Sequence, residues 1–171
     1  MGRCCFDTPL GWILLDWTER GLKRLRLLGP EPPPRSEPPE PPPFVREAQA
    51  RLLSFLGGAA PRFGDLPLDL EGLPPFHRRV LELLRDTRPG ERLSYGLLAR
   101  RAGSPGAARA VGQAMAHNPL PLLIPCHRVV AAQGPGGFSL FGSLATKEHL
   151  LALEEAAATL PLWSESSPKR S

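Results

Sequence analysis

The hydrophobic pattern of the first part of the chain predicts short strands and one helix. Apolar residues dominate Trp12–Trp17, and a polar turn separates this run from Leu22–Leu28, whose alternation is imperfect. Both runs are expected to be strands. Within Phe44–Leu56, apolar residues recur at the spacing of one helical face. Alternation between Leu66 and Leu70 predicts a further short strand.

A proline-rich segment interrupts this pattern. Residues 29–43 hold nine of the 22 prolines and several glutamates, which predicts an extended, solvated linker. A proline-rich ligand for a partner is the alternative. Leu73-Pro74-Pro75 marks a domain junction, so the expected domains are 1–74 and 75–158, followed by a disordered tail at 159–171.

Helical periodicity follows the junction. Phe76, Val80, Leu83 and Leu84 lie on one face of a predicted helix that stops near Arg88-Pro89-Gly90. A last helix is predicted over Leu144–Ala158.

Two short helices are predicted between these. Ser94 is a candidate N-cap for Tyr95–Ala102, and Gly103 suits the turn that follows. Ser104 is expected to cap a second helix, which ends before Asn118-Pro119. A helix, a glycine turn and a helix form the outline of a helix-turn-helix, although many helical pairs share it.

Arg109 lies on the polar face of the second of these helices. Small residues surround it, so the helix backbone has room to approach another surface. The alternative is an exposed arginine without a role, and the spacing leaves both open. The apolar face comprises Ala107, Val111, Ala114 and Met115.

The charge of the chain is unevenly distributed. Residues 76–150 carry ten basic and four acidic side chains, a net charge of +6, whereas residues 1–75 carry nine and ten, a net charge of −1. A basic half beside a near-neutral half indicates a polyanionic partner. A solvated arginine-rich surface is the alternative.

The cysteines predict a reduced, intracellular protein. Cys4 and Cys5 are adjacent and Cys126 stands alone, so no disulfide framework is expected. Asp16 soon breaks the apolar run Trp12–Leu15, which argues against a signal peptide. No membrane association is expected, because no apolar stretch approaches the length of a membrane span.

The chemistry-bearing segment begins with the apolar run Leu120–Pro125, which is expected to be extended and buried. It leads into Cys126, His127 and Arg128. Cations near a thiol lower its pKa, and the thiolate is the nucleophile, so this order predicts a reactive cysteine. The alternative is a buried, inert cysteine.

His127 needs a particular local geometry to assist Cys126. Neighbours on a strand point to opposite faces, so either the chain turns here or a water relays the proton. A carboxylate is also needed to orient the imidazole, and the last helix offers three candidates. No metal site is expected, because further ligands at useful spacing are missing. The three carboxylates are Glu148, Glu154 and Glu155.

Pro125-Cys126-His127-Arg128-Val129 resembles the active-site motif of the O6-alkylguanine-DNA alkyltransferases, or methylated-DNA–protein-cysteine methyltransferases. Asp7–Gly11 also resembles the opening strands of that family. Outside the resemblance lie the proline-rich insert and the residues after Ala158. The match also includes Phe76, Gly90-Glu91, Ser94-Tyr95, Ala107–Gly112, Asn118-Pro119, Lys147 and Leu150-Leu151.

The resemblance implies an α/β N-terminal domain of the ribonuclease-H-like type and a mainly helical C-terminal domain with a helix-turn-helix. It implies irreversible, single-turnover transfer of an alkyl group from O6-alkylguanine in double-stranded DNA, with O4-alkylthymine as a further substrate. No cofactor is implied. The implied monomer binds the minor groove with little sequence specificity, in the cytoplasm of a bacterium or the nucleus of a eukaryote.

The resemblance also assigns roles near the thiol. Cys126 is the implied alkyl acceptor, which His127 deprotonates through water. Glu154 matches the glutamate that orients the histidine. Asn118 matches the hinge residue between the DNA-binding helices and the active-site strand.

On the DNA side, Tyr95 is implied to crowd the target phosphate and contact the base. Arg109 is implied to fill the gap left by the extruded nucleotide. Gly96 and Ser104 lie at predicted helix starts, whose amides suit phosphates. His77 is a weaker phosphate candidate.

The loop that walls the alkyl pocket departs from the family. The family's tyrosine, small residue and two glycines are replaced here by Phe138–Ser143, which is one residue longer. The zinc site of some members also lacks its second cysteine near Lys23 and Arg24. The implied pocket residues are Tyr95, Pro121, Val129, Ser139, Phe141 and Gly142.

Three other functions compete with DNA repair. An alkyltransferase-like protein binds lesions without repairing them, but such proteins lack the cysteine that Cys126 supplies. A helix-turn-helix transcription regulator would show promoter specificity and need no thiol. A cysteine hydrolase would turn over repeatedly without DNA.

Overall fold

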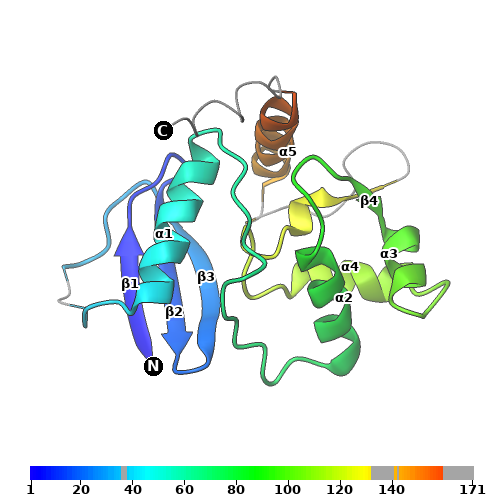
Figure 1. Cartoon of the computed structure of the whole chain (residues 1–171), viewed down its shortest axis with the longest axis horizontal. Coiled ribbons are helices and arrows are strands. Elements are labelled where there is room, and N and C mark those ends of the chain that lie inside the picture. Colours follow the sequence, from blue (N-terminus) through cyan, green and yellow to red (C-terminus); the bar gives the residue numbers. More distant parts are fainter. Residues whose placement is uncertain (36–37, 132–140, 142, 160–171) are drawn as a thin grey trace, which may run out of the picture.

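The chain folds into an N-terminal sheet with one helix, beside a mainly helical C-terminal part (Figure 1). The computed structural model describes residues 1–35, 38–131, 141 and 143–159. Within these residues the protein is mixed α/β, with five α-helices and two small sheets. No helix of the described chain combines the length and apolarity required to cross a bilayer.

The N-terminal sheet contains one strand that the sequence did not reveal. Strands β1 (Gly2–Phe6), β2 (Trp12–Thr18) and β3 (Gly21–Gly29) form an antiparallel sheet in the order β1-β2-β3, which confirms the two predicted strands. The Asp7–Gly11 segment, matched to the family's opening strands, is instead the turn between β1 and β2, closed by backbone hydrogen bonds between Thr8 and Gly11.

Two bulges explain the imperfect alternation of β3. In the register with β2, the pairing skips Lys23 and Leu28 on β3. Each bulge adds one residue to the strand and resets the alternation of its side chains. Leu22 and Leu25 are therefore both buried although they are three positions apart.

Helix α1 (Pro43–Leu56) packs on this sheet and confirms the predicted helix. The short strand predicted from Leu66 to Leu70 is absent from the described structure, where Leu68 makes a single bridge to Leu22. Pro67 has no N–H with which to extend a ladder. The buried residues of α1 are Val45, Ala48, Leu52, Phe55 and Leu56.

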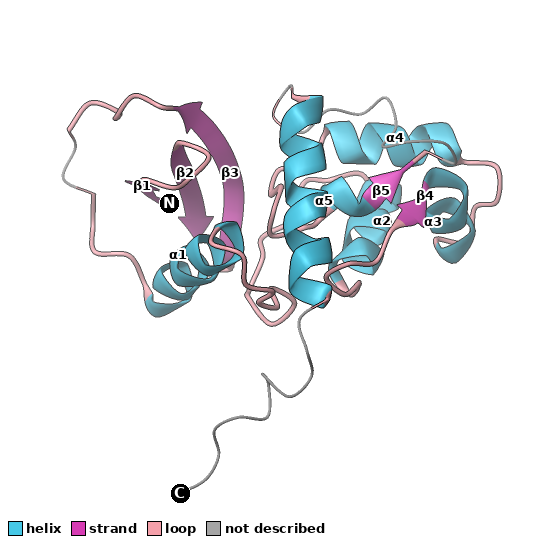
Figure 2. Ribbon diagram, turned by 90° about the horizontal axis from the view of Figure 1, so that it is seen from above, coloured by secondary structure: helices cyan, strands magenta, loops and turns pink. Residues whose placement is uncertain are grey.

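In the C-terminal part, α2 (Pro75–Arg85) and α5 (Leu144–Ala158) surround a small parallel pairing of β4 (Leu93–Ser94) with β5 (Val129–Val130) (Figure 2). Helix α2 ends three residues before the expected Arg88, where the Thr87 hydroxyl donates to the Leu84 carbonyl. Its buried residues are Val80, Leu81 and Leu84.

Of the two N-caps predicted for this helix pair, the first is confirmed and the second is wrong. Helix α3 (Tyr95–Arg101) begins as expected, with the Ser94 hydroxyl accepting from the Leu97 amide at 3.1 Å. Helix α4 (Ala108–Ala116) begins four residues later than Ser104, and Ala107 occupies its N-cap position. Gly106 has φ +86°, which stops a helix from continuing through it. The prediction that Ser104 caps a helix and presents helix-start amides is therefore wrong.

The Leu120–Pro125 segment is buried as expected, but it is not extended. The Ile124 amide donates to the Leu120 carbonyl at 2.8 Å, and Leu122 has φ +73°. The chain therefore folds back on itself before it reaches Cys126, in a conformation that Leu122 adopts only under the constraint of its surroundings.

Candidate active site

A single turn of 3-10 helix, η1 (Cys126–Arg128), carries the three candidate side chains. The Arg128 amide closes it by donating to the Pro125 carbonyl at 3.0 Å. The chain turns here, as in one of the two geometries considered for His127, but the turn does not pair the two side chains directly. Three residues per turn direct successive side chains about 120° apart, so Cys126 and His127 point in different directions. All three side chains are buried, with exposed fractions of 0% for Cys126, 1% for His127 and 5% for Arg128.

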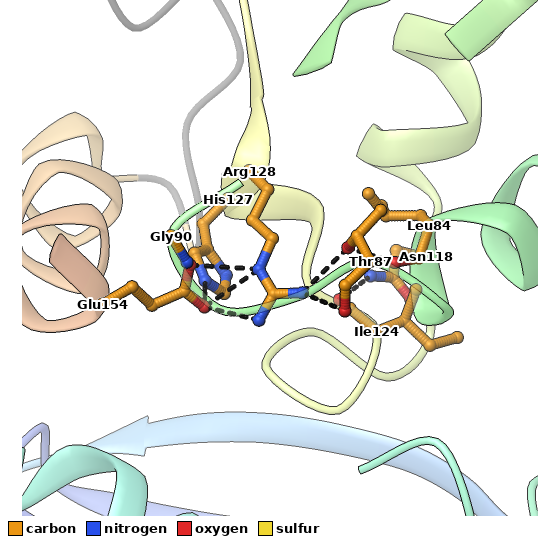
Figure 3. Close-up of polar contacts among 8 residues, drawn as sticks. All are labelled: Leu84, Thr87, Gly90, Asn118, Ile124, His127, Arg128 and Glu154. Atoms are coloured by element: carbon orange, nitrogen blue, oxygen red, sulfur yellow. Dashed lines mark hydrogen bonds and ion pairs between the residues drawn. The ribbon is translucent and has the colours of Figure 1, made fainter. Parts of the chain in front are cut away.

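Glu154 on α5 is the carboxylate that meets the imidazole. Its Oε1 lies 2.7 Å from His127 Nε2, and its side chain is buried (Figure 3). Glu155 instead pairs with Arg92 on the surface, and Glu148 is exposed. Of the three carboxylates considered, Glu154 therefore has the position to orient His127.

Arg128 holds Glu154 in place rather than approaching the thiol. Its Nε and Nη2 donate to the carboxylate at 2.8–3.0 Å, and its Nη1 donates to both oxygens of Thr87 at 2.8 Å (Figure 3). The Gly90 amide donates to the same carboxylate at 3.2 Å. Burial acts to raise the pKa of Glu154, but its hydrogen bonds with His127 and Arg128 outweigh burial and lower the pKa to about 2. Glu154 is therefore a fixed anion at neutral pH.

The thiol is not pre-ionised, contrary to the expectation from its cationic neighbours. Burial raises the pKa of Cys126 to about 11, although a hydrogen bond with Asn118 and the charge of Lys147 act to lower it. Lys147 is itself buried and donates from Nζ to the Val129 carbonyl at 2.7 Å. Desolvation dominates here, so Cys126 needs a base at neutral pH.

His127 has the properties of that base. Burial lowers its pKa, although the bond to Glu154 acts to raise it, so the imidazole is neutral at neutral pH. A neutral ring that donates Nε2–H to Glu154 keeps its lone pair on Nδ1. Nδ1 is buried and has no hydrogen-bond partner among the described residues.

Asn118 links the end of α4 to the thiol segment. Its Nδ2 donates to the Ile124 carbonyl at 3.0 Å, and its Oδ1 accepts from the Leu120 amide at 3.0 Å. These bonds hold the folded-back segment closed, in addition to the bond with Cys126. The hinge position implied for Asn118 lies at this junction.

The predicted DNA-contacting residues lie along α2, α3 and α4. Tyr95 is half-buried at the start of α3, and burial and the nearby Cys126 raise its pKa. Arg109 is exposed on α4, with no ion pair or hydrogen bond among the described residues. His77 lies in the first turn of α2, and its ring stacks on that of His117 with centroids 6.1 Å apart. Gly96 lies half-buried in the first turn of α3.

The predicted alkyl pocket is only partly described. Pro121 and Val129 are buried, and Phe141 is half-buried with φ +52°. Ser139 and Gly142 lie outside the described residues, as does the predicted tail from residue 160 onward.

A separate cleft of about 670 Å³ opens on the other side of Arg128, between the N-terminal and C-terminal parts. Arg51, Phe63, Arg85 and Leu123 are among its lining residues, and Cys126 is not. Among the described residues, no three His, Cys, Asp or Glu side chains gather as metal ligands.

Sequence reasoning missed the residues that support the catalytic candidates. Arg128 was seen only as a cation near the thiol, and no sequence signal pointed to Thr87. Lys147 was noted only as a matched position. These roles depend on contacts between segments far apart in the chain, which periodicity does not reveal.

Comparison with known proteins identifies the family. The family model described as "6-O-methylguanine DNA methyltransferase, DNA binding domain" matches residues 75–156. A methylated-DNA–protein-cysteine methyltransferase of Mycolicibacterium paratuberculosis is 40% identical, over 92% of this chain and 95% of that protein. The human protein of the same name is 39% identical, over 90% of this chain and 80% of that protein.

Solved structures agree with this assignment. The structure of Mycobacterium tuberculosis OGT in complex with DNA has a TM-score of 0.73 and 36% identity, covering 91% of this chain and 93% of that one. A structure of the O6-methylguanine methyltransferase of the same organism has a TM-score of 0.76 and 35% identity, covering 95% and 97%. The chain therefore belongs to the methylated-DNA–protein-cysteine methyltransferase family.

Proposed function

We propose that this protein repairs DNA by transferring an alkyl group from O6-alkylguanine, and from O4-alkylthymine, to Cys126, once per molecule. The observation that carries the proposal is the buried Cys126 thiol one residue from a His127–Glu154 pair, in a chain of this family. The thiol is protonated at neutral pH because its pKa is about 11, and the open Nδ1 of a neutral imidazole can accept its proton.

The proton path runs from Cys126 through a water to His127 Nδ1. The resulting imidazolium is stabilised by Glu154, whose own charge is held by Arg128. The thiolate sulfur then attacks the alkyl carbon, a C–S bond forms, and the bond from that carbon to guanine O6 breaks. The electron pair of the broken bond stays on the guanine, which takes up a proton.

The buried thiol requires the damaged base to leave the helical stack. A flipped base costs a few kcal/mol, which contacts on the DNA side must offset. In our proposal α3 and α4 act as a helix-turn-helix in the minor groove, and Arg109 fills the gap in the stack. Tyr95 crowds the target phosphate and contacts the base, while Gly96 and His77 contact the backbone. Little sequence specificity follows, because none of these contacts reads base identity.

The remaining proposals concern organisation. The domains are 1–74, of the ribonuclease-H-like type, and 75–158, which the family model closely overlaps. The protein is proposed to act as a monomer, in the cytoplasm of a bacterium or the nucleus of a eukaryote.

Intact-mass analysis after mixing with an O6-methylguanine oligonucleotide tests the proposal. One added methylene on the peptide that holds Cys126 is expected. Tight binding without a mass gain would indicate a lesion-binding protein, and preference for one unmodified sequence would indicate a transcription regulator. Repeated turnover without DNA would indicate a hydrolase.

A further inference from the structure

An aromatic contact joins the N-terminal helix to the candidate base. Phe55, in the last turn of α1, stacks on the His127 ring with centroids 5.9 Å apart and planes 27° apart. Both rings are buried, Phe55 at 3% exposure and His127 at 1%. One face of the imidazole is therefore covered by a residue more than 70 positions away in the chain.

The stack restrains a motion that the bond to Glu154 leaves open. A hydrogen bond at Nε2 fixes one corner of the imidazole, but the ring still tilts about that corner. A second ring stacked on it at an interplanar angle of 27° resists this tilt through dispersion and the preferred geometry of aromatic pairs. Nδ1 is separated from the fixed Nε2 by Cε1, so it is displaced when the ring tilts.

Phe55 is itself held on a second side. Phe63 meets it edge to face, with centroids 6.2 Å apart and planes at 85°. The ring thus has an aromatic neighbour as well as the α1 backbone to fix it. Phe63 also lines the cleft beside Arg128, so this region of the N-terminal part closely approaches the Glu154 cluster.

We propose that Phe55 is a positioning residue for proton transfer: by stacking on His127 it holds Nδ1 toward the thiol and excludes water from the imidazole face. The inference rests on the proposed function, in which His127 is the base. The N-terminal part would then contribute to the chemistry, because the stacking ring belongs to α1, whereas the thiol belongs to the C-terminal part.

The charged groups around His127 allow the proposal to be tested through the pKa of the imidazole. The charged groups facing His127 are Glu154 and Lys147 from α5 and Arg128 from η1, and none comes from α1. Burial lowers the imidazole pKa, and Phe55 is an uncharged ring that covers part of the imidazole. Removing its ring while keeping an apolar side chain should let the pKa of His127 rise toward its ordinary value.

The test compares Phe55→Leu with two matched variants in single-turnover transfer to the full-length protein. Phe55→Leu should slow transfer about tenfold, as expected for a displaced catalytic group, with unchanged affinity for lesion DNA. Phe55→Tyr keeps the ring and should restore most of the rate. Phe63→Leu removes the edge-to-face neighbour of Phe55 but leaves the stacked ring in place, and should slow transfer clearly less than Phe55→Leu does.

Two further readouts separate positioning from loss of stability. The acid limb of the pH–rate profile, and the His127 pKa measured by NMR with labelled histidine, should both move upward in Phe55→Leu and by less in Phe63→Leu. In a His127→Ala background, Phe55→Leu should cause no additional slowing, because its effect passes through the imidazole.

The outcomes distinguish this inference from the function on which it rests. An unaltered rate in His127→Ala would show that His127 is not the base. A slow His127→Ala with a normal Phe55→Leu, or with Phe63→Leu as slow as Phe55→Leu, would overturn the positioning role alone. Additive slowing in the double variant would show that Phe55 acts through general packing.

Discussion

The cluster around Glu154 and the outer surface of α4 use charge in opposite ways. In the cluster, Glu154 and Arg128 are buried and paired at 2.8 Å, with Thr87 taking the remaining guanidinium donors. On α4, Arg109 is exposed and has no partner among the described residues. A buried charge must be satisfied by the protein itself, whereas an exposed one is hydrated by water and stays accessible to a charged partner. The first arrangement suits fixed geometry for chemistry, and the second suits a polyanion.

Removing the nucleophile should separate the two regions most completely. Cys126→Ser should abolish transfer while the α3–α4 surface still binds lesion DNA, because a serine hydroxyl is far less acidic than a thiol. Single-turnover transfer and gel-shift affinity measure the two effects. Residual transfer in this variant would place the acceptor elsewhere, at Cys4 or Cys5.

Removing the base should slow transfer about 100-fold, within the range for general acid–base catalysis. The pH dependence is the sharper result. With His127 neutral above its lowered pKa, the unaltered protein should show a flat rate through neutral pH. In His127→Ala, thiolate must form by direct ionisation of a group with pKa about 11, so the rate should climb about tenfold per pH unit. A flat profile in both proteins would remove His127 from the mechanism.

Breaking the buried ion pair should cost far more stability than breaking a surface pair. Arg128→Met leaves Glu154 buried without its main partner, at a cost of about 3–5 kcal/mol in the free energy of unfolding. Arg92→Met breaks the exposed pair with Glu155 and should cost about 0–1 kcal/mol. Urea unfolding at pH 7 measures both. Equal losses would contradict the contrast between buried and exposed charge.

The pH dependence of that stability has a definite sign. The folded-state pKa of Glu154 is about 2, below its ordinary value of 4.5. Its contribution is therefore present above about pH 4.5 and is lost as the pH falls toward 2. The difference in stability between the unaltered protein and Arg128→Met should shrink over that window.

The sequence predicted the elements better than the site that they build. Helix α1, strands β2 and β3, and the Ser94 cap were predicted because each depends on local periodicity or a local hydrogen bond. The start of α4 was missed because Gly106 adopts a positive φ that the sequence permits but does not require. The backbone pairing of β1 was not visible in its short, mixed sequence.

At the site, the residues of the motif were identified, but their electrostatics were not. Cys126 is next to two potential cations in sequence, yet burial sets its pKa, and burial is a property of the whole fold. Arg128 turns to Glu154 because the two lie on elements 26 positions apart that meet only in the folded chain. Phe55 is farther still from His127 in sequence.

Replacing the exposed Arg109 should have a smaller effect, which falls mainly on repair. Arg109→Ala should slow transfer about tenfold while lowering DNA affinity only about two- to threefold, because its proposed task is to hold the flipped state and its charge is one of several. Arg101→Ala, an exposed cation at the end of α3, is the matched control and should lower both about equally. Equal losses for Arg109→Ala would make it an ordinary phosphate contact.

The smallest expected effect is a loss of stability when Cys126 becomes alkylated. An alkyl group on Cys126 enters a site with 0% exposure, where added volume displaces close-packed surroundings. Overpacking of this kind costs about 1–3 kcal/mol, which corresponds to a melting temperature lower by several degrees in a chain of this size. The loss should be greater for a benzyl than for a methyl group. Calorimetry of the protein before and after reaction with the alkylated oligonucleotide measures it, with Cys126→Ser mixed with the same DNA as control. An unchanged or higher melting temperature in the alkylated protein would show that the pocket has room for the group.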